Sequence, residues 1–232
     1  MDFVETERVL RGGITIDQLR LPFYRVSLKD NKLNVTVPRE DDDLIESAIA
    51  PSLRGDKFNL VTEDRGEFGG GVYAVSPQGR SITLSTQNAR GFFQSGQRHF
   101  VLTGLGKAGA IYEIHDLDAM PSLALITTLK GAPRGIAIED NRVYVLTVED
   151  FEMVEFREPG VRTTVLIERG PWDRVPVNMV KRGNEFAIGM HAGVVVVQLV
   201  GSSNQAALAR HYAKRGPPPV LRPGQSITGI KD

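Results

Sequence analysis

Three features of the sequence predict an all-β fold built from repeated four-stranded sheets. A pattern of about 43 residues recurs four times, beginning at Ala48, Arg90, Arg134 and Val177. Each copy contains a hairpin signature, in which a short polar turn separates two apolar runs rich in β-branched and aromatic residues. Two further extended runs follow each hairpin, so one repeat holds four short strands. A small twisted sheet of this kind buries both faces only against its neighbours, and the repeat therefore predicts the blades of a β-propeller.

The predicted hairpin turns use residues that tolerate a positive φ, as primed turns require. The four turn pairs are Gly55-Asp56, Gly96-Gln97, Asp140-Asn141 and Gly183-Asn184. The second strand of each hairpin is expected to carry an aromatic residue at a matching position, namely Phe58, Phe100, Tyr144 and Phe186. The outer two strands of the blades are predicted at "GVYAVSP" with "RSITLST", "AIYEIHD" with "LALITTLK", "FEMVEFRE" with "RTTVLIE", and "GVVVVQL" with "ALARHYA".

The two ends of the chain carry the pieces of one further blade. "GGITIDQL", "PFYRVSLK" and "KLNVTVP" are candidate strands near the N-terminus, and "SITGIKD" near the C-terminus resembles the start of an inner strand. If this C-terminal run joins the N-terminal strands, it completes a fifth blade and closes the ring. We therefore predict a single propeller domain over residues 1–232. In the alternative, "SLKDNKLNVTV" is itself an inner hairpin with Asp30-Asn31 as its turn, and the chain is a fragment of a larger ring.

Composition narrows the classes of function. The 28 Lys and Arg residues balance 28 Asp and Glu residues, so no net charge favours nucleic acid or an anionic membrane as a partner. The absence of cysteine excludes disulfides, thiolate nucleophiles and cysteine-bound metals. No apolar run approaches the roughly 20 residues of a membrane span, and no signal-peptide core follows Met1. We expect a soluble protein, whose compartment the composition does not indicate.

One repeat resembles a known family. The stretch "GAIYEIHDLDAMPSLALITTLKGAPRGIAIEDNRVYVLT" is similar to the LVIVD-type repeat of bacterial and archaeal β-propellers. In that repeat, a strand ending near Asp is followed by a Pro-containing turn, a strand and a Gly-flanked start of the next hairpin. The matching residues are Asp116, Pro121, Gly131, Gly135 and Tyr144. The resemblance implies the fold and carries over no catalytic residue, because the matching residues are structural.

Two sets of loops are expected to share one face around the propeller channel. The loops from the outermost strand of one blade to the inner strand of the next contribute Arg90, Arg134, Trp172, Asp173 and Arg174. The loops from the second to the third strand contribute Glu63, Asp64, Lys107, Glu149, Asp150 and His191. This face is where propellers usually bind ligands.

Four residues of this face are predicted to bind a partner. Arg90 and Arg134 occupy equivalent repeat positions before a glycine, where guanidinium groups suit a carboxylate, a phosphate or an acidic loop. The alternative is that each arginine binds carbonyl groups of the neighbouring blade. Trp172, in the loop "GPWDRVP", suits sugar stacking or protein contact, or else covers the end of a blade. Arg174 follows in the same loop.

No catalytic or metal-binding motif is recognisable. The histidines His99, His115, His191 and His211 lack the spacing of a zinc site, and no GxSxG, Walker A or dinucleotide motif occurs. We expect no cofactor. Ca²⁺ stays open as an alternative, held by the acidic run Glu40–Asp43 or by Glu63, Asp64, Glu149 and Asp150.

The favoured function is therefore a non-catalytic propeller that binds a protein partner through the loop face. Two alternatives stay open. One is a hydrolase or lyase acting on a saccharide or an ester, with loop carboxylates and Ca²⁺ at the channel mouth. The other is a carbohydrate-binding lectin, although lectin propellers tend to repeat their binding residues in every blade and Trp172 has no counterpart in the other repeats.

Overall fold

The computed structural model describes residues 3–5, 23–37, 49–157, 160–168, 176–190, 193–200, 206–214 and 226–228, with backbone alone for 3–5, 206–214 and 226–228. Every regular element in these ranges is a strand except one 3-10 helix, η2 (Gly66–Phe68). The chain divides into two compact units, which are described separately below. The first comprises Met1–Glu46 and Leu166–Asp232, and the second comprises Ser47–Val165.

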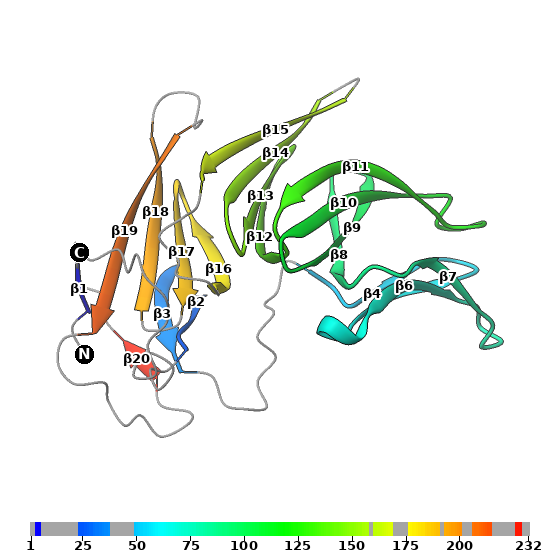
Figure 1. Cartoon of the computed structure of the whole chain (residues 1–232), viewed down its shortest axis with the longest axis horizontal. Coiled ribbons are helices and arrows are strands. Elements are labelled where there is room, and N and C mark those ends of the chain that lie inside the picture. The colour runs from blue at the N-terminus through cyan, green and yellow to red at the C-terminus, as the bar shows by residue number, and fades with distance from the viewer. Residues whose placement is uncertain are drawn as a thin grey trace. The chain divides into compact units, whose positions relative to one another are not determined.

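The second unit consists of three consecutive four-stranded sheets (Figure 1). Blade A contains β4 (Ser52–Arg54), β5 (Asn59–Asp64), β6 (Gly70–Val75) and β7 (Ser81–Ser85). Blade B contains β8 (Ala89–Ser95), β9 (Arg98–Leu105), β10 (Ala108–His115) and β11 (Ser122–Lys130). Blade C contains β12 (Pro133–Glu139), β13 (Arg142–Thr147), β14 (Phe151–Arg157) and β15 (Gly160–Ile167). Each strand is hydrogen-bonded to the next along the chain, which confirms the predicted all-β fold of consecutive blades.

Apolar side chains fill the space between neighbouring blades of this unit. Leu60 and Val72 of blade A pack in one cluster with Phe92 and Val101 of blade B. A second cluster joins blade B to blade C, and in it the ring of Phe100 lies 4.5 Å from that of Phe156 between centroids. Burial of each such side chain contributes about 1.5–3 kcal/mol. Each blade is therefore held by its neighbours as well as by its own hydrogen bonds.

The first unit contains two sheets. One has the order β1-β19-β18-β17-β16, and the other has the order β2-β3-β20. Their strands are β1 (Phe3–Glu5), β2 (Arg25–Lys29), β3 (Lys32–Thr36), β16 (Pro176–Arg182), β17 (Glu185–Met190), β18 (Gly193–Val200), β19 (Ala206–Lys214) and β20 (Ser226–Thr228). The side chain of Asn178 joins the two sheets, because its Oδ1 accepts a hydrogen bond from the Val26 amide at 2.9 Å and its Nδ2 donates to the Val26 carbonyl oxygen at 2.6 Å.

The chain ends pair partly as predicted. The C-terminal strand β20 joins an N-terminal strand, β3, which confirms that the two ends share a sheet. The hairpin β2–β3, turning at Asp30 and Asn31 with φ of 51° and 57°, is the one that the alternative reading placed there. The inner position predicted for the C-terminal run is wrong, since β20 lies on the far side of β3 from β2. Strand β1, which pairs with β19, was not predicted.

Other predictions about the ring are not decided by these sheets. The candidate strand "GGITIDQL" lies outside the described residues. The single domain over residues 1–232 and its closure as five blades stay predictions.

The predicted hairpin turns are confirmed in three of the four repeats. Gly96, Asp140 and Gly183 begin two-residue turns and have φ of 60°, 51° and 58°. The first repeat differs, because Gly55 donates to the carbonyl oxygen of Phe58 at 3.0 Å across a wider turn. Phe186 also departs from the pattern, since it stands one residue nearer its turn than Phe100 and Tyr144 do to theirs. It therefore lies on the opposite face of its hairpin.

The inner strands of three sheets share a β-bulge at their second residue. The register skips one residue between Ala89 and Gly91 in β8, and at the equivalent places in β12 and β16. The bulged residues are Arg90, Arg134 and Val177. A bulge redirects the side chain of the extra residue away from the regular alternation. Two of the predicted binding residues are thus placed by the same backbone irregularity.

Replacing Gly91 by Ala is expected to destabilise the second unit strongly. Gly91 has a φ of 147°, and an added Cβ would lie 2.0 Å from Cγ2 of Ile49 and 2.9 Å from the Ala50 carbonyl oxygen. We expect the free energy of unfolding to fall by about 3 kcal/mol, the sum of backbone strain and steric overlap. Urea denaturation measures this loss. Gly96→Ala is the control, because its φ of 60° carries the strain while the added Cβ meets no atom within 4 Å; equal losses in both variants would contradict the packing argument.

Candidate functional site

Two arginines and one aspartate from three successive blades form a cluster in the second unit. Asp64 is the last residue of β5 in blade A, whereas Arg90 and Arg134 are the bulged residues of blades B and C. Nη1 of Arg90 forms an ion pair with Oδ2 of Asp64, and their side chains are only 11% and 17% exposed. The predicted convergence of the two loop sets is therefore observed for these residues. Arg90 therefore links blade B to the neighbouring blade, as the structural alternative predicted, although it binds a carboxylate there and not a carbonyl group.

Arg134 lacks a partner of this kind. Among the described residues it forms no ion pair, and its Nε, like that of Arg90, is buried without a hydrogen-bond partner. Burial lowers the pKa of Arg134, the charge of Arg90 lowers it further, and the charge of Asp64 opposes these effects. The cluster thus holds two guanidinium groups and one carboxylate. An unpaired, desolvated cation is unfavourable for folding, so an anion bound beside Arg134 would stabilise the cluster.

The β5–β6 loop is built around Asp64. The second oxygen of the carboxylate, Oδ1, accepts a hydrogen bond from the Gly66 amide at 3.0 Å. Nδ2 of the buried residue Asn88 donates to the Gly66 carbonyl oxygen at 2.5 Å. Arg65 and Glu63 in turn form an ion pair at 2.6 Å. These contacts fix the start of the loop that leads from the cluster into η2.

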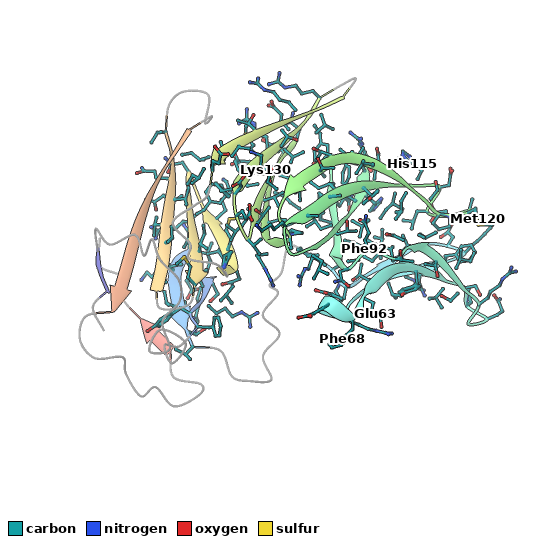
Figure 2. All side chains as sticks on the ribbon, in the orientation of Figure 1. Glu63, Phe68, Phe92, His115, Met120 and Lys130 are labelled. Atoms are coloured by element: carbon teal, nitrogen blue, oxygen red, sulfur yellow. The ribbon has the colours of Figure 1, made fainter. Side chains whose placement is uncertain are left out.

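An exposed aromatic ring lies on the same loop. Phe68, the last residue of η2, is 90% exposed (Figure 2). Most large apolar side chains of this unit are buried, so an exposed Phe on the loop that begins at Asp64 of the cluster is an unusual feature. Aromatic and arginine side chains are both enriched at protein interfaces. Phe68 is not among the predicted binding residues, and its one signal in the sequence is its place in the glycine-rich stretch "EFGGG" after Asp64.

A second cluster lies between blades B and C. Asp150 and Glu152 are each 2% exposed, and Oδ2 of Asp150 lies 3.9 Å from Nζ of Lys130. Oε1 of Glu152 accepts a hydrogen bond from the Lys130 amide at 2.9 Å. Burial raises the pKa of Glu152, the Lys130 amide lowers it, and the nearby charge of Asp150 raises it again. Asp150 is therefore buried, whereas it was predicted among the loop residues of the face around the channel.

The remaining candidates divide into observed and undescribed residues. Lys107 lies exposed in the β9–β10 turn, and His99 and His115 lie on β9 and β10 as predicted. Trp172, Arg174, Asp173, His191 and the acidic run Glu40–Asp43 lie outside the described residues. No group of three or more His, Asp or Glu side chains within the described ranges is arranged to hold a metal ion. The two acidic pairs are also used differently, since Asp64 pairs with Arg90 and Asp150 faces Lys130.

Comparison with solved structures shows a weak likeness in fold. No protein-family model matches the chain, and no curated protein matches its sequence. The chain is similar to the crystal structure of the N-terminal domain of Nup159, with a TM-score of 0.41 and 9% identity over 81% of this chain. The match spans 58% of that chain. At this level the likeness carries no inference about function, and the similarity to LVIVD-type repeats stays a prediction.

The helices of the described residues were compared with the requirements of a membrane span. None of these helices has the length and hydropathy needed to cross a bilayer.

Replacing Arg134 by Met is expected to leave the protein as stable as before, or more stable. Met matches the length of the side chain and removes a desolvated charge that has no ion-pair partner among the described residues. We expect the free energy of unfolding to change by between zero and about +1 kcal/mol. Arg90→Met is the matched comparison. It leaves Asp64 without its ion pair, and we expect a loss of about 1–3 kcal/mol by urea denaturation. Equal losses would assign Arg134 a purely structural role.

Glu152→Gln is expected to gain stability relative to wild type as the pH rises. Because burial raises the folded-state pKa of Glu152, its contribution to stability is complete below the unfolded pKa of about 4.3 and is lost as the pH rises through the raised value. Gln keeps an oxygen for the Lys130 amide and removes this dependence. Thermal melts from pH 4 to pH 8 measure the difference in melting temperature between variant and wild type.

Glu113→Gln serves as the control of opposite sign. The hydrogen bond from Arg98 lowers the pKa of Glu113, so the stability that this carboxylate contributes is present above the unfolded pKa and is lost as the pH falls through the lowered value. This variant should lose stability relative to wild type as the pH rises. The same trend for both variants would contradict the pKa assignment of Glu152.

Proposed function

We propose that this protein is a non-catalytic binding protein that uses the loop end of blades A, B and C to bind a protein partner. The loop end comprises the β5–β6, β9–β10 and β13–β14 loops together with the β7–β8 and β11–β12 connections. In an antiparallel meander these five segments emerge on one side, and the remaining turns emerge on the other. The cluster of Asp64, Arg90 and Arg134 and the exposed ring of Phe68 belong to the loop end.

The observation that carries the proposal is that the loop end holds a partly buried arginine without an ion pair among the described residues, and also an exposed aromatic ring. Arg134 has no carboxylate partner among the described residues, and Phe68 is 90% exposed. Each feature is unfavourable for an isolated domain, because one leaves a charge desolvated and the other leaves apolar surface in water. A protein partner that supplies an anion and an apolar contact relieves both costs.

The scaffold under this surface favours binding without a large conformational change. Arg90 and Arg134 are set on bulged inner strands whose blades are joined by continuous apolar clusters. Side chains held by packed strands lose little entropy on binding, which improves affinity. The hydrolase or lyase alternative has less support. Of the four loop carboxylates proposed for it, Asp64 pairs with Arg90, Glu63 pairs with Arg65, and Asp150 faces Lys130 in a separate cluster.

Photo-crosslinking from position 68 tests the proposal. A photoreactive phenylalanine analogue replaces Phe68, and the protein is irradiated in a lysate of its source. We expect one dominant crosslinked protein. Adding Arg134→Gln should reduce the yield of this product about tenfold or more, because an arginine at the centre of an interface typically contributes about 2 kcal/mol.

Position 120 provides the matched control. Met120 is also exposed, at 63%, but lies in the β10–β11 turn at the opposite end of blade B. The same analogue at position 120 should give only background crosslinks. Equal products from both positions, or a product from position 68 that is indifferent to Arg134, would contradict the proposal.

A further inference from the structure

The charge balance of the arginine cluster specifies the kind of group it can bind. Arg90 and Arg134 carry two positive charges, and Asp64 carries one negative charge that is held in place by Arg90 and by the Gly66 amide. One additional negative charge makes the cluster neutral. A second additional charge would face the fixed carboxylate of Asp64, whose side chain is only 17% exposed and so is incompletely screened by water.

We infer that this cluster is a receptor for a single carboxylate of the protein partner, and that Asp64 makes it discriminate against phosphate dianions. This inference rests on the proposed function and adds the chemistry of the bound group. A carboxylate matches the planar guanidinium fork and can accept two parallel hydrogen bonds from it. The carboxylate comes from an Asp or Glu side chain or from the C-terminus of the partner.

Arg134 is the primary contact in this arrangement. Nη1 of Arg90 already forms an ion pair with Oδ2 of Asp64, whereas Arg134 makes no ion pair among the described residues. Arg134 stays partly exposed while its Nε is buried. The incoming carboxylate therefore binds the terminal nitrogens of Arg134, and the positive charge of Arg90 strengthens the contact.

Phe68 specifies what stands next to the carboxylate. The β5–β6 loop runs from Asp64 through η2 to Phe68, so the exposed ring belongs to the same short segment as the aspartate of the cluster. If the residue next to the carboxylate in the partner were polar, the ring of Phe68 would stay exposed to water. The structure thus fits a partner segment in which the carboxylate is adjacent to an apolar side chain.

The test is a titration of the whole protein with two small anions, followed through the NMR signals of the arginine Nε–H groups. The probes are acetate, a monoanion, and inorganic phosphate at pH 7.8, mainly a dianion, both at constant ionic strength with chloride as the background ion. The signal of Arg134 is assigned from its loss in Arg134→Met. We expect acetate to shift the Arg134 signal saturably. Phosphate should bind at least about tenfold more weakly than acetate, because Asp64 repels the second charge.

Asp64→Asn is the decisive variant. It keeps an oxygen that can accept the Gly66 hydrogen bond and raises the charge of the cluster by one. We expect this variant to bind phosphate at least as tightly as acetate. Arg134→Met, which is expected to fold stably, should bind neither anion. Arg80→Gln, which removes an exposed arginine from the β6–β7 turn at the opposite end of blade A, should bind both as wild type does.

The source of the carboxylate is decided by two capped amino acids. N-acetyl-leucine has a free C-terminal carboxylate beside an apolar side chain, whereas the dipeptide N-acetyl-glutamyl-leucine amide carries its carboxylate on a side chain. Tighter binding of one identifies the source, and either should lose several-fold in affinity in Phe68→Ala.

The inference is overturned if phosphate binds wild type as tightly as acetate, or if neither anion shifts the Arg134 signal. Its failure differs from failure of the proposed function. If only the inference fails, Arg134-dependent crosslinking from position 68 persists while the preference for acetate over phosphate is lost or reversed. If that crosslinking is itself absent, the proposed function fails whatever the titration shows.

Discussion

The structure depends on one constraint, which is that each small sheet has two apolar faces and no other element to cover them. In the second unit every inner strand contributes residues to an interblade cluster, such as Phe92 of β8 to the cluster with blade A and Phe93 of β8 to the cluster with blade C. The only helix among the described residues is the single turn η2, so sheets are covered by sheets. The period of the sequence follows from this constraint, because every blade must present similar faces to its neighbours.

The same constraint determines where function can reside. Substitutions within the interblade clusters cost several kcal/mol each, so side chains can be exchanged with less loss of stability at the ends of the blades. At the loop end the chain passes between blades through short segments, and the inner strands begin there with a bulge. The bulge takes the second residue of the strand out of the regular alternation of side chains. Such a position combines a fixed backbone with freedom in side-chain chemistry.

Much of the fold follows from local sequence. Turn pairs such as Asp140-Asn141, alternating apolar residues and the spacing of the repeats identify the strands, since these signals report backbone geometry directly. The pairings made by the chain ends are less accessible. Strand β1 has only three residues and β20 also three, too few for a periodic signal, and their partners are far away in sequence. Whether the C-terminal run lay inside or outside β3 depends on packing that no local pattern records.

The candidate site was predictable in part for the same reason. Arg90 and Arg134 were found because they repeat at equivalent positions, whereas Asp64 was grouped with possible metal ligands. Its role as the counter-ion of Arg90 depends on contact between two blades. Phe68 was missed because exposure, and not residue type, makes it notable. A sequence motif indicates which residues recur, but burial and charge compensation arise only from the three-dimensional neighbours of each residue.

The bulge in β16 shows that the second position of an inner strand does not need an arginine to form the bulge. In β16 the bulged residue is Val177, an apolar side chain that is 6% exposed, and the register shift is the same as in β8 and β12. The backbone irregularity therefore forms without an arginine. The guanidinium groups of Arg90 and Arg134 are then an addition to the fold, and Arg134 is an addition that lacks a counter-ion among the described residues. Arg134 costs desolvation energy at a position where another blade uses valine, and this cost is the reason for which we propose that it binds a ligand.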